Sequence, residues 1–441
     1  MSSSIDAYVA AITSIAEADN VLPQVVNEFA AVARAIDNSD DLRNKLGDEL
    51  LPIAVRQGIV EKLLEGKGHR VTAQCVALVI GAGHGRDLRT ISEKISTNSA
   101  HAHGREVRSV VEKARKTIAS LLNTSPAEIF FTSGGTEADN TAIRCGILDH
   151  GITHAITSKI EHHAVLHTLE ALAYEGIIKL SFVNINEKGR IDLAHLEELL
   201  KTHPKTLVSL MHANNEIGTL TNIEHVGELC EQYDALFHSD TVQTMGHYRH
   251  DLSKLKAHFL VCAAHKIHGP KGVGFLYINH KIKIKPFIYG GAQERNMRGG
   301  TENVYGIVGL AKALELAYAN MDKHQAHIQE LKVYMMEELK KTVPEVDFNG
   351  ETAITDSLYT VLNVAFPKME MADMLLFNLD IAGISASGGS ACSSGSNIGS
   401  HVLNGIGADS SRPAVRFSFS KFTTKEEIDF VINKIKELNL F

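Results

Sequence analysis

The sequence predicts an α/β protein with a large, mostly parallel sheet, a smaller α+β domain after it and an all-helical bundle before it. From Asn98 onward, short apolar runs of strand type alternate with stretches of helical periodicity, which is typical of βαβ units. Before residue 96, apolar residues recur every three or four positions and no strand pattern is present. We therefore expect three domains, 1–96, 98–320 and 321–441.

The first segment is expected to contain six helices. Their predicted ranges are 5–16, 22–36, 39–46, 52–64, 71–80 and 86–95. The glycine-rich stretch 81–85 resembles a phosphate loop, but no strand precedes it, so we interpret it as a helix break.

The later segments supply strands at regular intervals. In the large domain the predicted strands are 128–132, 154–157, 179–183, 206–211, 235–238 and 258–262. A long helix over 304–338 is expected to lead into the small domain. There the predicted elements are strands 358–364 and 415–419 and a closing helix 424–438.

Composition excludes several classes of protein. A net charge of −8 argues against a nucleic-acid partner, and no apolar run is long enough to span a membrane. The N-terminus has no secretory signal pattern. The five cysteines are odd in number and scattered, which gives neither a disulfide framework nor a zinc pattern. We expect a cytoplasmic protein without a metal site.

Lys266 is the residue around which the chemistry is predicted. The apolar run from Phe259 ends in His265 and Lys266, and a turn rich in glycine and proline follows. A lysine where a buried strand reaches a loop lies at the ligand-binding edge of an α/β sheet. When partly desolvated, such an amine can form a Schiff base with a carbonyl cofactor. The alternative is a surface lysine after a strand.

Two further turns predict sites for the parts of such a cofactor. Gly135 and Thr136 follow a strand and open a helix, so that backbone N–H groups and a hydroxyl face an anion such as phosphate. Asp240 ends another strand and can keep a heterocyclic nitrogen protonated, as the ring of pyridoxal phosphate requires, and Gln243 can reach its phenolic oxygen. The alternatives are helix caps at ordinary turns.

Four other side chains stand at strand ends or in polar loops. His162 could lie on a cofactor ring and move protons, although most of the 23 histidines must be structural. Asn215 could bind an oxygen atom, and Arg416 on a strand suits a carboxylate. Their alternatives are a polar turn and an exposed edge strand. Cys392, unlike the other cysteines, lies among Gly and Ser, as an exposed, mobile nucleophile would.

From about residue 98 to its end, the chain resembles the cysteine desulfurases of the class V aminotransferase family. The motifs that carry the resemblance, in order, are FTSGGTEADN, EHHAV, MHANNEIGT, HSDTVQ, AHKIHGPKGVG, RGGTEN, SGGSACSSGS and VRFSFSKFTTKEEID. The resemblance implies the fold of pyridoxal-phosphate-dependent transferases. The long Gly/Ser-rich cysteine loop is similar to that of the iron–sulfur-cluster type, which passes persulfide sulfur to a scaffold or acceptor protein.

The resemblance also implies a role for each candidate residue. Lys266 would hold the cofactor, with Asp240 at its ring nitrogen, Gln243 at the phenolic oxygen and His162 stacked on the ring. The residues at the phosphate would be Gly135, Thr136 and His265, with Thr301 from the second subunit of a homodimer.

The implied reaction is the removal of sulfur from L-cysteine to give L-alanine. Asn215, which also borders the cofactor, and Arg416 would hold the substrate carboxylate. Lys266 and His162 would carry protons, and Cys392 would take the sulfur as a persulfide.

Residues 1–96 resemble the helical domain of the ATP synthase delta subunit, which docks to a partner subunit. The matching features are 6–8, 15–16, 42–51, 61–64 and 86–91. The desulfurase resemblance departs from its family at two places: Ala263 replaces a serine, and the family's first strand, similar to Tyr-Leu-Asp-Asn-Ala-Ala-Thr-Thr, is not found before Asn98. A selenocysteine lyase and a non-catalytic fusion that docks to an ATP synthase-like assembly remain alternatives.

Overall fold

The computed structural model describes residues 2–48, 51–65, 68–99, 102–369, 374–389 and 399–438. The chain divides into two compact units, Met1–Val110 and Val111–Phe441. Helix α7, Ala102–Leu121, includes residues of both. No helix in the described part of the chain is long and apolar enough to cross a membrane.

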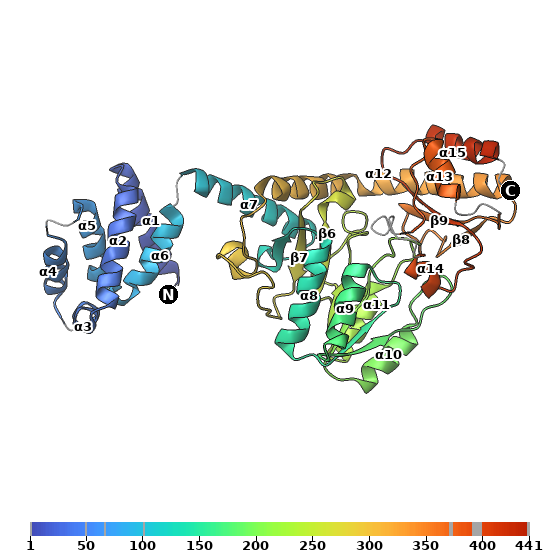
Figure 1. Ribbon diagram of the computed structural model, residues 1–441. Coiled ribbons are helices and arrows are strands. Elements are labelled where there is room, and N and C mark those ends of the chain that lie inside the picture. Colours follow the sequence, from blue (N-terminus) through green and yellow to red (C-terminus); the bar gives the residue numbers. More distant parts are fainter. Residues whose placement is uncertain are drawn as a thin grey trace. The chain divides into compact units, whose positions relative to one another are not determined.

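Every regular element described in the first unit is a helix, as the apolar periodicity predicted. Its helices are α1 Ser2–Ala18, α2 Leu22–Asp37, α3 Asp40–Gly47, α4 Ile53–Leu64, α5 Arg70–Gly81 and α6 Leu88–Ser99, with a 3-10 turn at Gly85–Asp87 (Figure 1). Ser39 begins α3 by accepting a hydrogen bond from the Leu42 amide at 3.3 Å. The predicted break after residue 81 is confirmed, because α5 ends there and Gly83 adopts φ +85°.

A seven-stranded sheet forms the centre of the second unit. Its order is β1-β7-β6-β5-β4-β2-β3. The strands are β1 Ile129–Thr132, β2 His154–Thr157, β3 Lys179–Phe182, β4 Thr206–Ser209, β5 Leu236–Ser239, β6 Phe259–Ala263 and β7 Gly274–Ile278. All are parallel except β7, which pairs antiparallel with both β1 and β6. The predicted mostly parallel sheet is therefore confirmed.

The two antiparallel pairings of β7 decide where the loops of the sheet meet. Because β7 reverses direction against β6, and β1 reverses again against β7, β1 points the same way as β6. The carboxyl ends of β1, β2, β4, β5 and β6 consequently lie at one edge of the sheet. This is the edge at which the predicted site residues leave their strands.

Helices cover both faces of this sheet. The buried side chains of α8 Gly135–His150 and α9 His163–Tyr174 pack on one face. On the other face pack α7, α10 Leu193–Thr202, α11 Ile223–Gln232 and the first half of α12 Val304–Thr342. The central strands β6 and β7 are buried along their whole length, which explains their nearly continuous apolar sequences, whereas the edge strand β3 is partly exposed.

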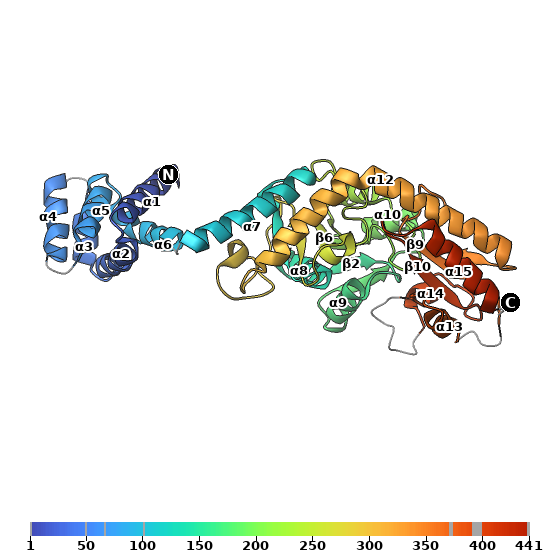
Figure 2. The same ribbon diagram turned by 90° about the horizontal axis from the view of Figure 1, so that it is seen from above.

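The second half of α12 extends to a smaller antiparallel sheet, as Figure 2 shows. That sheet has the order β10-β9-β8. Its strands are β8 Asp347–Asn349, β9 Val361–Ala365 and β10 Ala414–Ser418, and its helices are α13 Leu375–Ile381, α14 His401–Gly405 and α15 Lys425–Leu438. The predicted long helix and closing helix are confirmed.

The sequence analysis missed β7 and β8. β7 follows the glycine- and proline-rich turn after Lys266, and no strand was predicted there. β8 has three residues, too few for a period of two to be recognised.

Candidate active site

Loops at the carboxyl edge of the large sheet enclose a cavity of about 160 Å³. In α/β sheets this edge is where ligands bind. Arg416 reaches the same cavity from β10, so both sheets contribute to it. The cavity is lined by Gly135, Thr136, Asp139, His162, Met211, Asn215, Asp240, Val242, Gln243, Ala263, His265, Lys266 and Arg416.

Lys266 lies in a short 3-10 turn, Ala264–Ile267, directly after β6. The turn closes at His268, whose backbone is left-handed with φ +62°. At Gly269 a Cβ atom would lie 2.9 Å from the Ala264 carbonyl oxygen, so the close turn requires glycine there. Lys266 also lines a neighbouring cavity of about 180 Å³ bordered by α12, β9 and β10. The lysine thus stands between two cavities.

Three buried acids lie at or next to the cavity. Asp139 and Asp240 line it, and Glu161 accepts a hydrogen bond from the amide of the cavity residue Met211. Loss of water raises the pKa of each carboxyl group, to about 8 for Glu161. At Asp139 the neighbouring acids raise the pKa further, whereas His162 and Lys266 oppose the rise at Asp240. The Val242 amide also donates to Asp240 Oδ1 at 2.9 Å. Asp240 is therefore the acid of this group that has basic side chains beside it, which oppose the rise in its pKa that burial causes.

His162 is held by the start of α9. As the N-cap residue its Nδ1 accepts a hydrogen bond from the Ala164 amide at 3.1 Å, which leaves the proton of the neutral ring on Nε2. One ring nitrogen of His162 and one oxygen each of Asp139 and Asp240 lie within 4.8 Å of one another. At this distance the protonation state of each of the three groups affects the pKa of the other two.

Asp139 and His238 face each other in the core without forming an ion pair. Burial lowers the pKa of His238 to about 3, so its ring is neutral, and its Nδ1 lies 2.8 Å from the Ser209 hydroxyl. His238 Nε2 is 3.3 Å from Asp139 Oδ1, but neither atom has a hydrogen-bond partner. A neutral ring beside a carboxyl group of raised pKa gains no ionic attraction.

The turn between β1 and α8, where an anion site was predicted, opens a helix at the cavity. Gly134 has φ +153°, and a Cβ atom on Gly135 would lie 2.9 Å from Val242 Cγ2. The backbone therefore passes closer to the β5 loop than other residues allow, and the first N–H groups of α8 have no partner within the helix. Glu137 in this turn is bound by Arg298, Nε to Oε1 at 3.0 Å. Its charge is thereby balanced.

Arg416 and Asn215 join the small sheet to the large one. Arg416 Nη1 donates to the Asn215 backbone carbonyl at 2.9 Å, and the Arg416 backbone pairs with Ser387. The guanidinium group lies at the cavity, where it suits an incoming carboxylate.

Among the predicted site residues that the structure describes, Thr301 is not brought into the cavity. Thr301 lines a different cavity of about 120 Å³ with Ser133, Gly300 and Glu302. Cys392 lies outside the described residues. The other four cysteines are buried, and loss of water raises the pKa of each thiol, so none of them resembles a nucleophile.

The sequence analysis missed Asp139, Met211 and Val242 as cavity residues. Asp139 had a usable signal, because it follows Thr136 by three residues on α8 and therefore shares its face. Met211 and Val242 carry no functional group that would have marked them.

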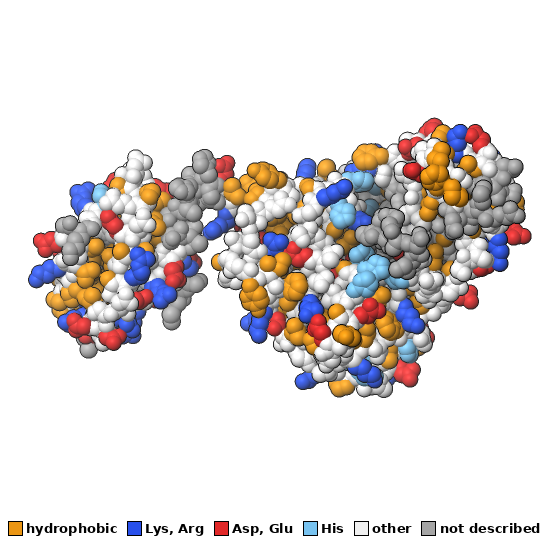
Figure 3. All heavy atoms as spheres, in the orientation of Figure 1, with side chains coloured by type: hydrophobic (Ala, Val, Ile, Leu, Met, Phe, Trp, Pro, Cys, Tyr) orange, Lys and Arg blue, Asp and Glu red, His pale blue; other side chains and the backbone are white. Residues whose placement is uncertain are grey.

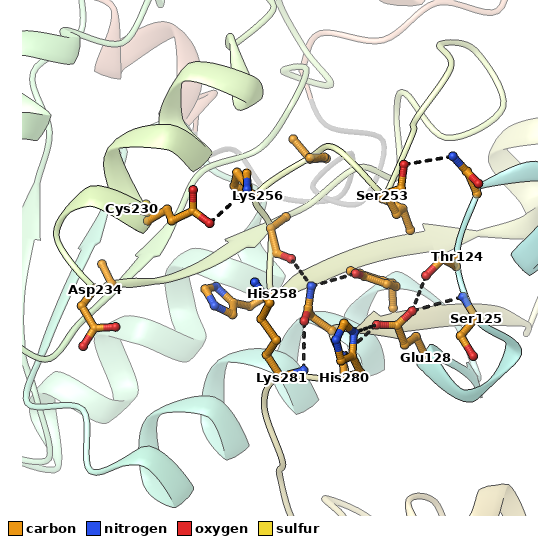
Figure 4. A pocket seen from close by; sticks show the side chains of 18 residues that line it. Thr124, Ser125, Glu128, Cys230, Asp234, Ser253, Lys256, His258, His280 and Lys281 are labelled. Carbon is orange, nitrogen blue, oxygen red and sulfur yellow. Dashed lines mark hydrogen bonds and ion pairs between the residues drawn. The ribbon is translucent and has the colours of Figure 1, made fainter.

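A larger cavity, about 580 Å³, is at the opposite edge of the sheet (Figure 4). It is bordered by the residues that precede β1, β5 and β6 and follow β7. The buried carboxylate of Glu128 accepts hydrogen bonds there from Thr124, the Ser125 amide and His280. Because these polar groups already form hydrogen bonds with one another, we interpret this cavity as a structural feature and not as a ligand site.

Comparisons with known proteins agree with this geometry. Residues 79–431 match the family Aminotransferase class-V, and residues 5–121 match the family ATP synthase delta (OSCP) subunit. Cysteine desulfurase IscS of Dictyoglomus turgidum is 41% identical over 74% of this chain and 82% of its own length. Putative cysteine desulfurase IscS 1 of Bacillus subtilis is 41% identical over 75% of this chain and 87% of its own.

Solved structures show the same similarity. A NifS-like protein is 36% identical with a TM-score of 0.70, covering 78% of this chain and 90% of that one. A NifS-like protein from Rickettsia africae is 30% identical with a TM-score of 0.69, covering 77% and 90%.

Proposed function

The chain belongs to the class V aminotransferase family, and from this we propose that it is a pyridoxal-phosphate-dependent cysteine desulfurase. It converts L-cysteine to L-alanine and supplies the sulfur for iron–sulfur clusters or another sulfur-transfer pathway. The observation that carries the proposal is the meeting of Lys266, Asp240, His162 and Arg416 around one cavity, in a chain 41% identical to curated cysteine desulfurases.

The residues present fit pyridoxal phosphate. Lys266 offers the amine, and Asp240 is a buried acid whose neighbours favour ionisation beside a protonated ring nitrogen. The absent Cβ of Gly135 lets the first turn of α8 lie against Val242, and the N–H groups of that turn, which have no partner within the helix, suit a phosphate. We assign the remaining contacts to Thr136, Gln243, His265, Asn215 and His162, and Thr301 to the site of a second subunit. When bound, the cofactor withdraws electrons from the substrate Cα.

The chain's own residues then divide the work. Arg416 and Asn215 hold the substrate carboxylate, and the Lys266 Nζ takes the Cα proton. The Cys392 thiolate attacks the substrate sulfur: a new S–S bond forms on Cys392 as the Cβ–S bond breaks, and protonation of the carbon fragment gives alanine. His162, with its proton on Nε2, returns protons at the ring face.

We propose that the second unit acts as a homodimer. Thr301 stands apart from the cavity of its own chain, and the nearby Tyr289 and Tyr305 are 78% and 91% exposed. Large exposed aromatic side chains are enriched in interfaces between protein chains. A second copy would cover them and bring Thr301 to the partner's phosphate site.

We propose a separate docking role for the helical unit. Its match to the ATP synthase delta (OSCP) family supports an ATP synthase-type partner.

The sulfur would pass from Cys392 to a scaffold or acceptor protein in the cytoplasm. The described cysteines, all unpaired, are consistent with a reducing compartment.

The test is an assay of the purified full-length chain for alanine and sulfide from L-cysteine, with the absorbance of the bound cofactor recorded alongside. We expect a coloured protein that produces both. Cys392→Ala should keep the colour and lose sulfide release, and Lys266→Ala should lose the covalently bound form. A coloured wild type that forms no alanine would refute the proposed reaction.

A further inference from the structure

Three histidine rings that the proposed reaction does not use gather at the beginning of α9. The ring centre of His163 lies 4.6 Å from that of His167 and 4.4 Å from that of His401. Figure 3 shows histidine side chains collected on this face of the molecule. His163 is half-buried and His167 is exposed, so solvent reaches the pair.

The pair has the geometry of a chelate. His163 and His167 are four residues apart and therefore lie on the same side of the helix, one turn from each other. His163 Nδ1 and His167 Nε2 are 3.2 Å apart. Two imidazole nitrogens that each bind an ion at about 2.0–2.1 Å are separated by this distance when the angle at the ion is about 100°. That angle is close to tetrahedral.

The protonation state of His163 also suits a metal ion. Loss of water and the neighbouring rings of His401, His167 and His162 lower the pKa of His163, so its ring is neutral near pH 7. Neutral imidazole is the form that binds metals. In the free protein, a single proton between Nδ1 and Nε2 makes the hydrogen bond, and an ion would take the place of that proton.

The neighbouring ring of His401 fixes the position of the chelate. His401 Nε2 donates to the Glu161 backbone carbonyl at 2.9 Å, which holds its ring against His163. Such contacts restrain a ligand ring before the metal arrives. The start of α9 is further fixed by the His162 cap.

We propose that His163 and His167 bind one divalent first-row transition metal ion, such as Zn²⁺ or Ni²⁺, through Nδ1 and Nε2, with water in the other positions. Imidazole ligands select these ions over Mg²⁺ and Ca²⁺, which prefer oxygen. The cysteine spacing used in the sequence analysis could not reveal this site, because both ligands are histidines. The site does not depend on the proposed desulfurase reaction.

The test is calorimetric titration of Ni²⁺ into the full-length, cofactor-loaded protein without a histidine tag. Every sample carries Cys392→Ser, which removes a competing thiolate. We expect one site that His163→Gln and His167→Gln each weaken at least about tenfold, because each removes one of two ligands. Mg²⁺ should give no binding heat.

His225→Gln is the matched control, because His225 is an exposed helical histidine on α11 with no histidine one turn away. It should leave Ni²⁺ binding unchanged. Unchanged cofactor absorbance in His167→Gln would show that the exposed substitution preserves the fold. Equal Ni²⁺ affinity in the parent, His163→Gln and His167→Gln would overturn the proposal, as would an equal loss in the control.

Discussion

Replacing one member of the buried Arg115–Glu294 pair is expected to destabilise the second unit by about 3–5 kcal/mol, because the other charge is left without its partner. The pair is bidentate, with Nη1–Oε2 at 2.9 Å and Nη2–Oε1 at 2.8 Å, and each side chain is 2% exposed. Glu294 also accepts from the Phe131 amide of β1 at 2.8 Å. Replacing both residues by Met removes both charges of the pair. It leaves the Phe131 amide without a hydrogen-bond acceptor, which costs about 1–3 kcal/mol.

Thermal unfolding followed by circular dichroism would measure this effect. The expected order of melting temperature is wild type, then Arg115→Met/Glu294→Met, then either single variant. Arg249→Met is the control, because the Arg249–Asp322 pair is 60% and 84% exposed and contributes at most about 1 kcal/mol. A double variant that loses as much as the two single variants together would refute the reasoning. Because β1 leads into the Gly135 turn, the single variants should also bind the cofactor more weakly.

Four further substitutions test the site and the core. Asp240→Asn removes the charge expected at the ring nitrogen, which lowers the pKa of that nitrogen by about 1–3 units, so alanine formation should fall tenfold or more while the circular dichroism spectrum stays the same. Gly135→Val places a side chain where a Cβ atom already meets Val242 Cγ2 at 2.9 Å, so a fluorescence titration should show weaker cofactor binding. Glu161 holds its proton in the folded state up to a pKa of about 8, against an ordinary 4.5, so the folded state of the cofactor-free protein binds more protons and loses stability as pH rises through that window. Glu161→Gln should remove this part of the slope in urea unfolding, and an unchanged slope would contradict the assignment. Burial lowers the pKa of Lys332 to about 8 from 10.5, so stability should rise with pH between those values, and Lys332→Met should abolish that rise.

The sequence predicted the elements whose pattern is local. The helices of the first unit and the strands that begin near residues 129, 154 and 206 were identified because apolar period and length decide between helix and strand. The residues after those strands were expected to meet, because parallel strands end at one edge. Nine predicted residues do line one cavity: Gly135, Thr136, His162, Asn215, Asp240, Gln243, His265, Lys266 and Arg416.

What the sequence could not supply depends on contacts between distant segments. Strand β7 runs antiparallel to both of its neighbours, β1 and β6. No local sequence pattern indicates which strands it pairs with. Asp139 became visible as a cavity residue once α8 was placed against the loop after β5. The proximity of His238 to Asp139 could not be predicted either, because a histidine in a buried strand has the same sequence pattern whether or not an acid faces it.

The charge balance of the site explains why a cationic ring suits it better than a neutral one. Asp139, Glu161 and Asp240 are all withdrawn from water, and each would be protonated more readily there than in solution. Ionising any two of them together is unfavourable, because their charges repel within a region of low polarity. A protonated ring nitrogen beside Asp240 would offset the charge of that acid while Asp139 stays neutral. The buried acids thus favour one positive charge at one position, which is the protonation state that an electron-withdrawing pyridine ring needs for the reaction.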